Sequence, residues 1–526
     1  MKRRLLRPAL LRASARACAA LAIAAVIAAP LPASAANYVA ISGSGSSWSA
    51  VALDQWQQDL RPNGLVINYN PDGSAAGRGD YMANQDDFAG SDPPFRNGHD
   101  QLGGTGAERP NQGYSYIPDT AGGTAFMYHI EVAGHLVTNL RLRGATIMKI
   151  FTNQITNWDD KQITKDYGAQ LPSLPITPVI RSDGSGATFF FTRWMAHVFP
   201  ADWNAFCKKV KPSVHFPCGQ TEFYPLFRGA KSENGSNNVA TYVTASYGNG
   251  AIGYDEYAYA LNAHYPVVKV LNPAGYFVLP SASNVAVALT KAVINENSSS
   301  PDFLQQNLDS VYTFTDPRSY PLSSYSYLIV PRKGTHEPTN FSNAKGKTLS
   351  TFADYFLCGG QREVAALGYS PLPLNLVKGG LLQSSKIPGA IPGPNLTTLA
   401  GCNNPTFTNG KLTLLLDAPQ PSPCDKLGAP LNCVVVNGKA TTPGAGNGSP
   451  SPGASVSESP GALVSAGPSP VSSGPIAVTP QVVNVSASSP SKLTLSVLTA
   501  IAIILAVVVP PALSGWLRRR RRQETG

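Results

Sequence analysis

The stretch Arg181–Thr188, with the sequence RSDGSGAT, constrains the fold more than any other part of the chain. It follows a β-branched apolar run at 175–180 and precedes the aromatic residues of 189–195. This order predicts a strand that breaks at glycines and restarts as a helix. The first N–H groups of such a helix have no partner within it, and here a hydroxyl and a guanidinium lie beside them. The stretch therefore predicts a cradle for an oxyanion, with an Asp-Gly turn capped by Ser185 as the alternative.

The same pattern recurs nearer the N-terminus, where three predicted strands lead into turns that carry a polar residue. These are Ser47 after the strand 38–41, Ser74 after the strand 66–69, and Asp92 at the end of the strand 87–92. In open α/β sheets, ligands bind outside the carboxyl ends of the strands, so the repetition predicts one α/β site. The first of these loops lacks the third glycine of a dinucleotide-binding fingerprint, which argues against a Rossmann fold.

The rest of the chain continues the alternation of strands and helices up to about residue 376. The patterns predict a crossover into a strand at 119–131, a helix around 147–151, a strand and turn at 248–261, a helix at 284–295, a strand at 325–330 and a helix at 349–356. The 526 residues exceed one ordinary domain, so we expect two lobes with additional segments.

The positive net charge of +10 does not indicate a nucleic-acid partner, because the excess sits at the two ends of the chain. Six of the 41 Lys and Arg residues lie within the first 16 residues, and five more form the run 518–522. The remaining 30 are matched by 30 Asp and Glu once Glu524 of the tail is set aside. The central part of the chain is therefore neutral, and no binding of nucleic acid is expected.

The N-terminus has the features of an export signal. Residues 1–35 combine a basic start, an alanine-rich apolar run and small residues before a cleavage site near Ala35. Cys18 stands at the head of the apolar run, whereas a lipid-acceptor cysteine would follow it. We therefore expect a cleaved signal peptide without lipidation.

The C-terminus has the features of a membrane anchor. Residues 441–492 consist mostly of Pro, Gly, Ser and Ala and predict a disordered spacer. Leu493–Val509 is uncharged and mostly apolar, and arginines follow it. This predicts a transmembrane helix at 493–513 and a cytoplasmic basic tail at 514–526, which would hold the central region outside the cell membrane.

Six cysteines remain after the predicted cleavage, and an even number in an exported chain favours disulfides. No two of them have the C-x-x-C spacing of a zinc site. Cys207 with Cys218 is the preferred pair and Cys424 with Cys433 is a second candidate, while the full connectivity stays open.

The sequence lacks the marks of a catalyst. Ser185 is not in a Gly-x-Ser-x-Gly nucleophile elbow, and Gly346-Lys347-Thr348 has Phe341 where a phosphate-binding P-loop needs its first glycine. The histidines are scattered, and no His-Glu-x-x-His motif occurs. We therefore predict a protein that is not an enzyme and that has no metal site and no cofactor.

Seven short motifs, in order along the chain, resemble the periplasmic phosphate-binding proteins of the phosphate-specific ABC transporter, which are type II solute-binding proteins. The resemblance covers roughly residues 38–375. It rests on the segments 43–48, 73–74, 88–92, 150–160, 181–188, 250–254 and 367–373.

The resemblance implies an α/β fold of two lobes that close on phosphate. It also implies which residues would bind the anion. Ser47 and Trp48 would supply a hydroxyl and a backbone contact, and Ser74 would supply a hydroxyl and its own N–H. The others are Asp92, Arg181 and, at the helix start, Ser185, Gly186 and Ala187. Asp183 would hold Arg181 in place.

Asp92 would select the anion under this hypothesis. A carboxylate accepts a hydrogen bond from protonated phosphate, whereas sulfate offers it no proton. Two departures from the family pattern bear on affinity and ligand choice: Ala187 stands where the family usually has threonine, and the turn 74–77 reads Ser-Ala-Ala-Gly instead of Ser-Ser-Gly-Gly.

The predicted function is a membrane-anchored receptor that captures inorganic phosphate and delivers it to the permease subunits of an ABC transporter. The alternatives are a surface-anchored interaction or scaffold protein that reuses the fold, or a binder of another oxyanion. The predicted organisation assigns 36–120 and 275–375 to lobe 1, 121–274 to lobe 2 and 376–440 to a cysteine-containing extension.

Overall fold

The computed structural model describes residues 38–98, 100–104, 106–297, 299–300, 305–334, 336–407 and 413–442. All of them belong to the first of two compact units, which spans Met1–Gly448. The predicted signal peptide at 1–35, the transmembrane helix at 493–513, the tail at 514–526 and nearly all of the spacer lie outside the described residues. Among the residues described, no helix has the length and apolar character needed to cross a membrane.

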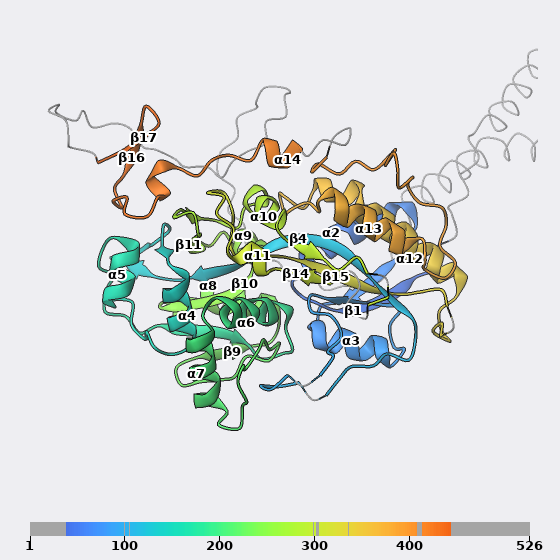
Figure 1. Cartoon of the computed structure of the whole chain (residues 1–526), viewed down its shortest axis with the longest axis horizontal. Helices are drawn as coiled ribbons and strands as arrows, with labels where there is room; N and C mark the ends of the chain where they lie inside the picture. Colours follow the sequence, from blue (N-terminus) through green and yellow to red (C-terminus); the bar gives the residue numbers. More distant parts are fainter. Residues whose placement is uncertain are drawn as a thin grey trace, which may run out of the picture. The chain divides into compact units, whose positions relative to one another are not determined.

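One eight-stranded sheet runs through the described residues, in the order β2-β1-β3-β15-β4-β10-β8-β9 (Figure 1). Its strands are β1 (Ile41–Gly45), β2 (Ile67–Asn70), β3 (Phe88–Ser91), β4 (Tyr114–Tyr128), β8 (Thr177–Arg181), β9 (Lys231–Glu233), β10 (Ala251–Glu256) and β15 (Ser323–Pro331).

The long strand β4 joins the two halves of this sheet. Its residues 114–123 pair antiparallel with β15, and its residues 124–128 pair antiparallel with β10. On one side β1 pairs in parallel with β2 and β3, and on the other β8 pairs in parallel with β9 and β10. We call the half with β1–β3 and β15 lobe 1 and the half with β8–β10 lobe 2.

The remaining strands of the described residues form four smaller sheets. They are β7 (Arg141–Leu142) with β11 (Lys269–Leu271) and β12 (Phe277–Val278), β5 (Glu131–Val132) with β6 (His135–Leu136), β13 (Val293–Ile294) with β14 (Gln306–Asn307), and β16 (Val434–Val436) with β17 (Lys439–Thr441).

The helices pack apolar faces against the sheet. In α2 (Ala50–Leu60), for example, Leu53, Trp56 and Leu60 recur at helical spacing and are buried, as their pattern predicts. The others are α3 (Ser74–Met82), α4 (Gly144–Phe151), α5 (Lys161–Tyr167), α6 (Gly186–Val198), α7 (Pro200–Val210), α8 (Gly235–Thr244), α9 (Tyr257–Asn262), α10 (Ala282–Leu289), α11 (Asp309–Tyr312), α12 (Asn343–Leu357), α13 (Leu374–Ser384) and α14 (Thr413–Leu416), with 3-10 turns η1 (Arg61–Asn63), η2 (Ser246–Gly248), η3 (Gly359–Arg362) and η4 (Pro423–Asp425).

Two predicted strands differ in position because glycines take part in them. β1 begins at Ile41, where the predicted strand ends, and it continues through the Ser-Gly residues. Gly43 belongs there because a β-carbon at that position would lie 2.4 Å from the ring of Phe88. The Gly-Gly pair near residue 122 lies inside β4 rather than before a strand, and a β-carbon on Gly122 would meet the ring of Trp48 at 2.8 Å.

The predicted boundary between lobe 1 and the extension, at residue 375, falls inside α13. Leu376, Val377 and Leu381 of this helix are buried. Gly380 lets the helix approach closely, because a β-carbon there would lie 2.6 Å from Leu357 of α12. Lobe 1 therefore extends to the end of α13, which Figure 1 shows beside α12.

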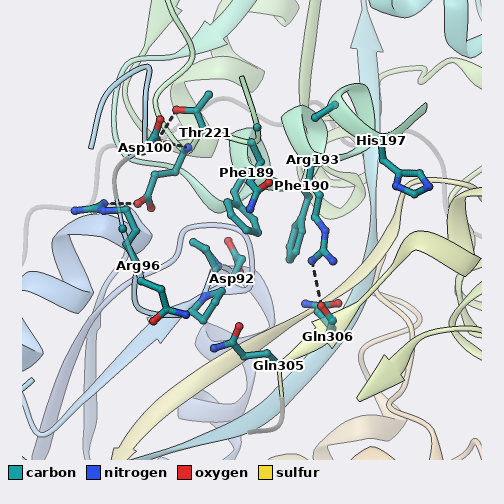
Figure 2. Close-up of a pocket in the computed structure, with 18 of the residues that line it drawn as sticks. Asp92, Arg96, Asp100, Phe189, Phe190, Arg193, His197, Thr221, Gln305 and Gln306 are labelled. Carbon is teal, nitrogen blue, oxygen red and sulfur yellow. Dashed lines mark hydrogen bonds and ion pairs between the residues drawn. The ribbon is translucent and has the colours of Figure 1, made fainter. Parts of the chain in front are cut away.

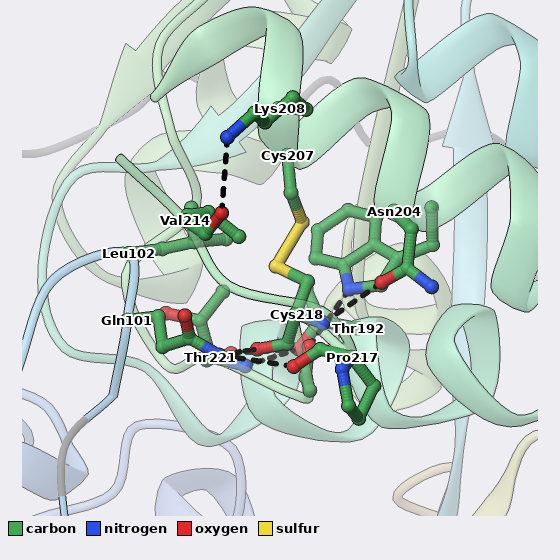
Figure 3. Close-up of a disulfide and its surroundings, with 12 residues drawn as sticks. Gln101, Leu102, Thr192, Asn204, Cys207, Lys208, Val214, Pro217, Cys218 and Thr221 are labelled. Atoms are coloured by element: carbon green, nitrogen blue, oxygen red, sulfur yellow. Dashed lines mark hydrogen bonds between the residues drawn. A yellow bond between two sulfur atoms is a disulfide. The ribbon is translucent and has the colours of Figure 1, made fainter. Parts of the chain in front are cut away.

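The structure forms both predicted disulfides, Cys207–Cys218 and Cys424–Cys433, and a third between Cys358 and Cys402. Figure 3 shows Cys207–Cys218, which ties α7 to the segment that leads to Thr221. Gln101 of lobe 1 donates hydrogen bonds to the carbonyl oxygens of Pro217 and Cys218, at 2.9 and 3.3 Å. The bridged segment of lobe 2 thus contacts lobe 1 directly.

Candidate functional site

The predicted ligand residues lie where strands end and helices begin, and all of them are buried. Ser47 and Trp48 follow β1, Ser74 begins α3, Asp92 follows β3, and Ser185, Gly186 and Ala187 form the start of α6 directly after β8 and Arg181. The first three loops belong to lobe 1 and the last to lobe 2. The predicted residues therefore come together from both lobes.

Direct contacts join the loops of the two lobes. Nη2 of Arg181 donates to the hydroxyl of Ser47 at 2.9 Å, and the N–H of Ala75 donates to the carbonyl of Gly184 at 3.1 Å. The carboxylate of Asp92 lies against the helix start, because a β-carbon on Gly186 would be only 1.6 Å from its Oδ2. Only glycine fits at position 186 beside this carboxylate.

Hydroxyl groups surround the carboxylate of Asp92. Both of its oxygens accept from Ser46 at 2.9 Å, Oδ2 also accepts from Ser74 at 3.3 Å, and Oδ1 accepts from Ser326 at 2.5 Å. Burial raises the pKa of Asp92 to about 6, although these hydrogen bonds and the charge of Arg181 oppose the shift.

The guanidinium of Arg181 is fully occupied by protein acceptors. Nε donates to Asp183 at 2.8 Å and Nη2 to the same carboxylate, as well as to Ser47. Nη1 donates to the hydroxyl of Ser236 at 3.0 Å and to Oδ2 of Asp255 at 3.2 Å. Arg181 has five N–H groups, so each has one acceptor. Asp183 lies against Arg181 as the resemblance implies, whereas Asp255 shares the charge from the other side.

The start of α6 combines a capped end with two open donors. The side chain of Ser185 accepts from the N–H of Thr188 at 3.4 Å, and the N–H of Ser185 donates to the carbonyl of Glu222. The N–H groups of Gly186 and Ala187 have no hydrogen-bond partner within the described part of the chain. One helix start therefore holds a capping hydroxyl and two N–H groups without a partner among the described residues, and the role of its residues toward a ligand stays a prediction.

Trp48 acts as an apolar contact between the lobes. Its ring packs edge-on against Phe190 of α6 and against Tyr369, with centroids 6.2 and 5.8 Å apart. The backbone N–H of Trp48 donates to the hydroxyl of Ser46 at 3.0 Å. The backbone contact that the resemblance implies for Trp48 therefore goes to Ser46 in this structure, and its role toward a ligand stays a prediction.

The sequence did not predict four residues whose side chains hydrogen-bond to the side chains of predicted ligand residues: Ser46, Ser236, Asp255 and Ser326. Ser46 adjoins Ser47 in a serine-rich loop, so the composition of that loop was a usable signal. Asp255 directly follows the motif 250–254. Ser236 and Ser326 lie in elements whose local patterns show only a helix and a buried strand, so nothing in the sequence marked them.

A cavity of about 640 Å³ adjoins these residues, and Asp92 lines it (Figure 2). Its other walls come from both lobes and include Arg96, Phe190, Arg193 and Glu222. Asp92 is the one predicted ligand residue among those described that lines the cavity. The other predicted ligand residues are buried and do not line it.

A family model described as the PBP superfamily domain matches residues 31–359. The phosphate-binding protein PstS of Xylella fastidiosa (strain Temecula1) is 31% identical over 344 residues, which are 65% of this chain and 83% of that protein. The chain belongs to the PstS family of phosphate-binding proteins. PstS 2 of Mycobacterium tuberculosis is 29% identical over 342 residues, covering 63% of this chain and 83% of the relative. A solved phosphate-binding protein from Stenotrophomonas maltophilia covers 71% of this chain and 99% of its own, with 17% identity and a TM-score of 0.47.

Membership in the PstS family confirms the resemblance that the seven motifs indicate. Proteins of this family bind solutes and are not enzymes. The prediction of a protein without catalytic activity is therefore correct at the level of the family. The individual ligand residues, in contrast, stay predictions.

Proposed function

We propose that this chain captures inorganic phosphate between its two lobes. The convergence of Asp92, Arg181 and the start of α6 in one buried contact carries this proposal. The hydroxyls of Ser47 and Ser74 and the open N–H groups of α6 are donors suited to an oxyanion. The names of the PstS relatives support phosphate as that oxyanion.

Asp92 distinguishes phosphate from sulfate in this proposal. Its carboxylate accepts the proton that phosphate carries near neutral pH, and sulfate has no such proton. Two acceptors facing each other in a buried site cost about 1–3 kcal/mol, so sulfate binds more weakly. The ring of hydroxyl donors around Asp92 keeps its carboxylate in place for this contact.

We further propose that the captured phosphate passes to the permease of an ABC transporter when the lobes separate. The strand β4, which is paired with one lobe along each half of its length, is the connection about which they would move. The predicted signal peptide and transmembrane helix would place this receptor on the outer side of the cell membrane, tethered to it.

Calorimetric titration of the purified full-length chain with phosphate tests the proposal. We expect saturable binding of one phosphate and weak competition by sulfate. A folded chain that shows no response to phosphate, sulfate or arsenate would reject phosphate capture and favour the interaction or scaffold function.

Asp92→Asn and Asp354→Asn form a matched pair for the same titration. Burial raises the pKa of both carboxyls to about 6, but Asp354 accepts from Ser384 between α12 and α13 and has no hydrogen bond or ion pair with a predicted ligand residue among the described residues. Only Asp92→Asn should reduce the preference for phosphate over sulfate, by about tenfold or more. Equal effects of the two substitutions would mean that Asp92 is not part of the phosphate site.

A further inference from the structure

The cavity beside Asp92 extends from buried to exposed residues. Asp92 and Phe95 are buried, whereas Asn97 and His197 of the same lining are exposed. The cavity therefore joins one residue of the predicted phosphate site to the solvent. Its walls belong to both lobes, with α6 on one side and the segment that follows Asp92 on the other (Figure 2).

The charge of this cavity opposes the entry of an anion. Among the described residues, four carboxylates and two guanidiniums line it, those of Asp92, Asp100, Glu222, Asp309, Arg96 and Arg193. Arg96 is tied to Glu222 at 2.5 Å and to Glu108 at 3.0 Å, so its charge is neutralised within the contact between the lobes. An entering anion therefore depends on the second guanidinium, that of Arg193.

Arg193 differs from Arg96 because its carboxylate partner is distant. Its Nη2 lies 3.9 Å from Oδ1 of Asp309, whose side chain is 49% exposed, so this pair is weak. Its Nη1 donates to the carbonyl of Gln306 at 3.1 Å, as Figure 2 shows. The N–H of Gln306 in turn donates to the hydroxyl of Tyr327 in β15, at 2.8 Å. Lobe 1 thus holds the guanidinium at the wall of the cavity while leaving most of its charge uncompensated.

We propose that Arg193 attracts phosphate into this cavity and guides it to Asp92 before the lobes enclose it. This inference rests on the phosphate capture proposed above and adds a residue that controls its rate. Among the described residues, Arg193 has no hydrogen bond or ion pair with a predicted ligand residue. A charge at the rim of a site changes the rate of association and its salt dependence more than it changes the rate of dissociation.

Stopped-flow mixing of the purified full-length chain with inorganic phosphate tests this guidance. Tryptophan fluorescence is the readout, because Trp48 packs between the lobes. Arg193→Met should slow association at least about threefold at about 0.01 M salt but less than about 1.5-fold at about 1 M salt, since salt screens the charge. Dissociation should change by less than about twofold. Arg193→Lys keeps the charge and should associate within about 1.5-fold of the unsubstituted rate.

Asp309→Asn separates guidance from a structural role, because it breaks the same ion pair but removes a negative charge. Association should then become at least about twofold faster at about 0.01 M salt. If Arg193→Met and Asp309→Asn change the rates in the same direction, the pair only holds the lobes together and the inference is wrong.

Arg318→Met is the matched control. Its side chain is 20% exposed, as that of Arg193 is, and it pairs with Asp316, but it does not line the cavity. Both rates should stay unchanged in this variant. Equal slowing in Arg318→Met and Arg193→Met would reflect the net charge of the chain and reject guidance by Arg193.

The unsubstituted chain separates the two proposals. Absence of phosphate binding in its titration rejects phosphate capture itself. Phosphate binding together with an association rate that Arg193→Met leaves unchanged at about 0.01 M salt preserves phosphate capture but rejects guidance by Arg193.

Discussion

Arg78 and Arg181 are the two arginines that the fold encloses most completely, and each pairs with two carboxylates. Arg78 of α3 binds Glu108 at 2.7 Å and Glu222 at 2.6 Å, and so connects lobe 1 to a loop of lobe 2. Arg181 binds Asp183 and Asp255 within lobe 2 and reaches the hydroxyl of Ser47 in lobe 1. Both side chains thus hold the lobes together.

The balance of charge separates the two clusters. Arg96 also contacts Glu108 and Glu222, so two cations face two carboxylates around Arg78. Burial alone would raise the pKa of Glu108, but Arg78 lowers it below its ordinary value. Around Arg181 the cation is outnumbered, and the pKa of Asp255 is raised. A neutral network suits a purely structural contact, whereas an unbalanced cluster lined with hydroxyls suits a ligand that completes it.

The substitution Arg78→Met should produce the largest effect, on stability. It leaves Glu108 and Glu222 buried with only the half-buried Arg96 as a cation. Breaking a buried pair in this way costs about 3–5 kcal/mol of unfolding free energy, which urea unfolding measures. Arg109→Met, at an exposed arginine next to Glu108, is the control and should change stability by less than about 0.5 kcal/mol. A loss below about 1 kcal/mol in Arg78→Met would show that Arg96 alone balances the cluster.

The same substitution at Arg181 should act on binding. Arg181→Met removes the cation and the donor that fixes Ser47, so we expect phosphate to bind at least about 30-fold more weakly. Folded Arg78→Met should keep its affinity to within about threefold, because its cluster contacts no predicted ligand side chain. Calorimetric titration of both variants with phosphate, under conditions in which they are folded, measures the two affinities. Equal loss of affinity would mean that the clusters act together, as one contact between the lobes.

The buried carboxyl of Asp119, which feels the charge of Asp92, predicts a pH-dependent stability. Burial raises the pKa of Asp119 to about 8, although the N–H of Thr120 opposes this and Asp92 adds to it. The folded chain therefore holds this proton more tightly than the unfolded chain, so stability falls as the pH rises from about 4 to about 8. Asp119→Asn should be more stable than the unsubstituted chain by about 2 kcal/mol at the upper end. The difference in stability between the two chains should vanish at about pH 4. Urea unfolding at about pH 4 and about pH 8 measures it. A constant difference would exclude this titration as its cause.

The sequence predicts the loops of the site better than it predicts the partners of Arg181. Ser47, Ser74, Asp92 and the start of α6 stand directly after strands, and small residues at strand ends leave a local pattern. Ser236 and Asp255, in contrast, follow Arg181 by 55 and 74 residues and meet it only in the folded chain. The segment around Ser236 shows only the pattern of a helix, and Asp255 is marked only by its position directly after the motif 250–254.

The fold, too, is predicted correctly only where the pattern is local. Helices with regular apolar spacing, such as α4 and α12, are predicted correctly because spacing alone buries one face. Glycine-containing strands are misplaced, because Gly43 and Gly122 are required by rings from other segments, Phe88 and Trp48. Long-range contacts of this kind leave no trace in local periodicity.

Ala187 offers the finest test of how the Arg181 cluster binds its ligand. The residue is fully buried in the first turn of α6, beside the predicted donors Ser185 and Gly186. Ala187→Ser adds one hydroxyl at the position where the family resemblance leads us to expect threonine. One neutral hydrogen bond contributes about 0.5–1.5 kcal/mol, so phosphate should bind about two- to tenfold more tightly. Ala196→Ser, two to three turns further along α6, should leave affinity unchanged.

Tighter binding in Ala187→Ser alone would show that neutral donors at the helix start still limit affinity. Unchanged affinity would mean that the backbone N–H groups and the hydroxyls of lobe 1 already satisfy every oxygen of the anion.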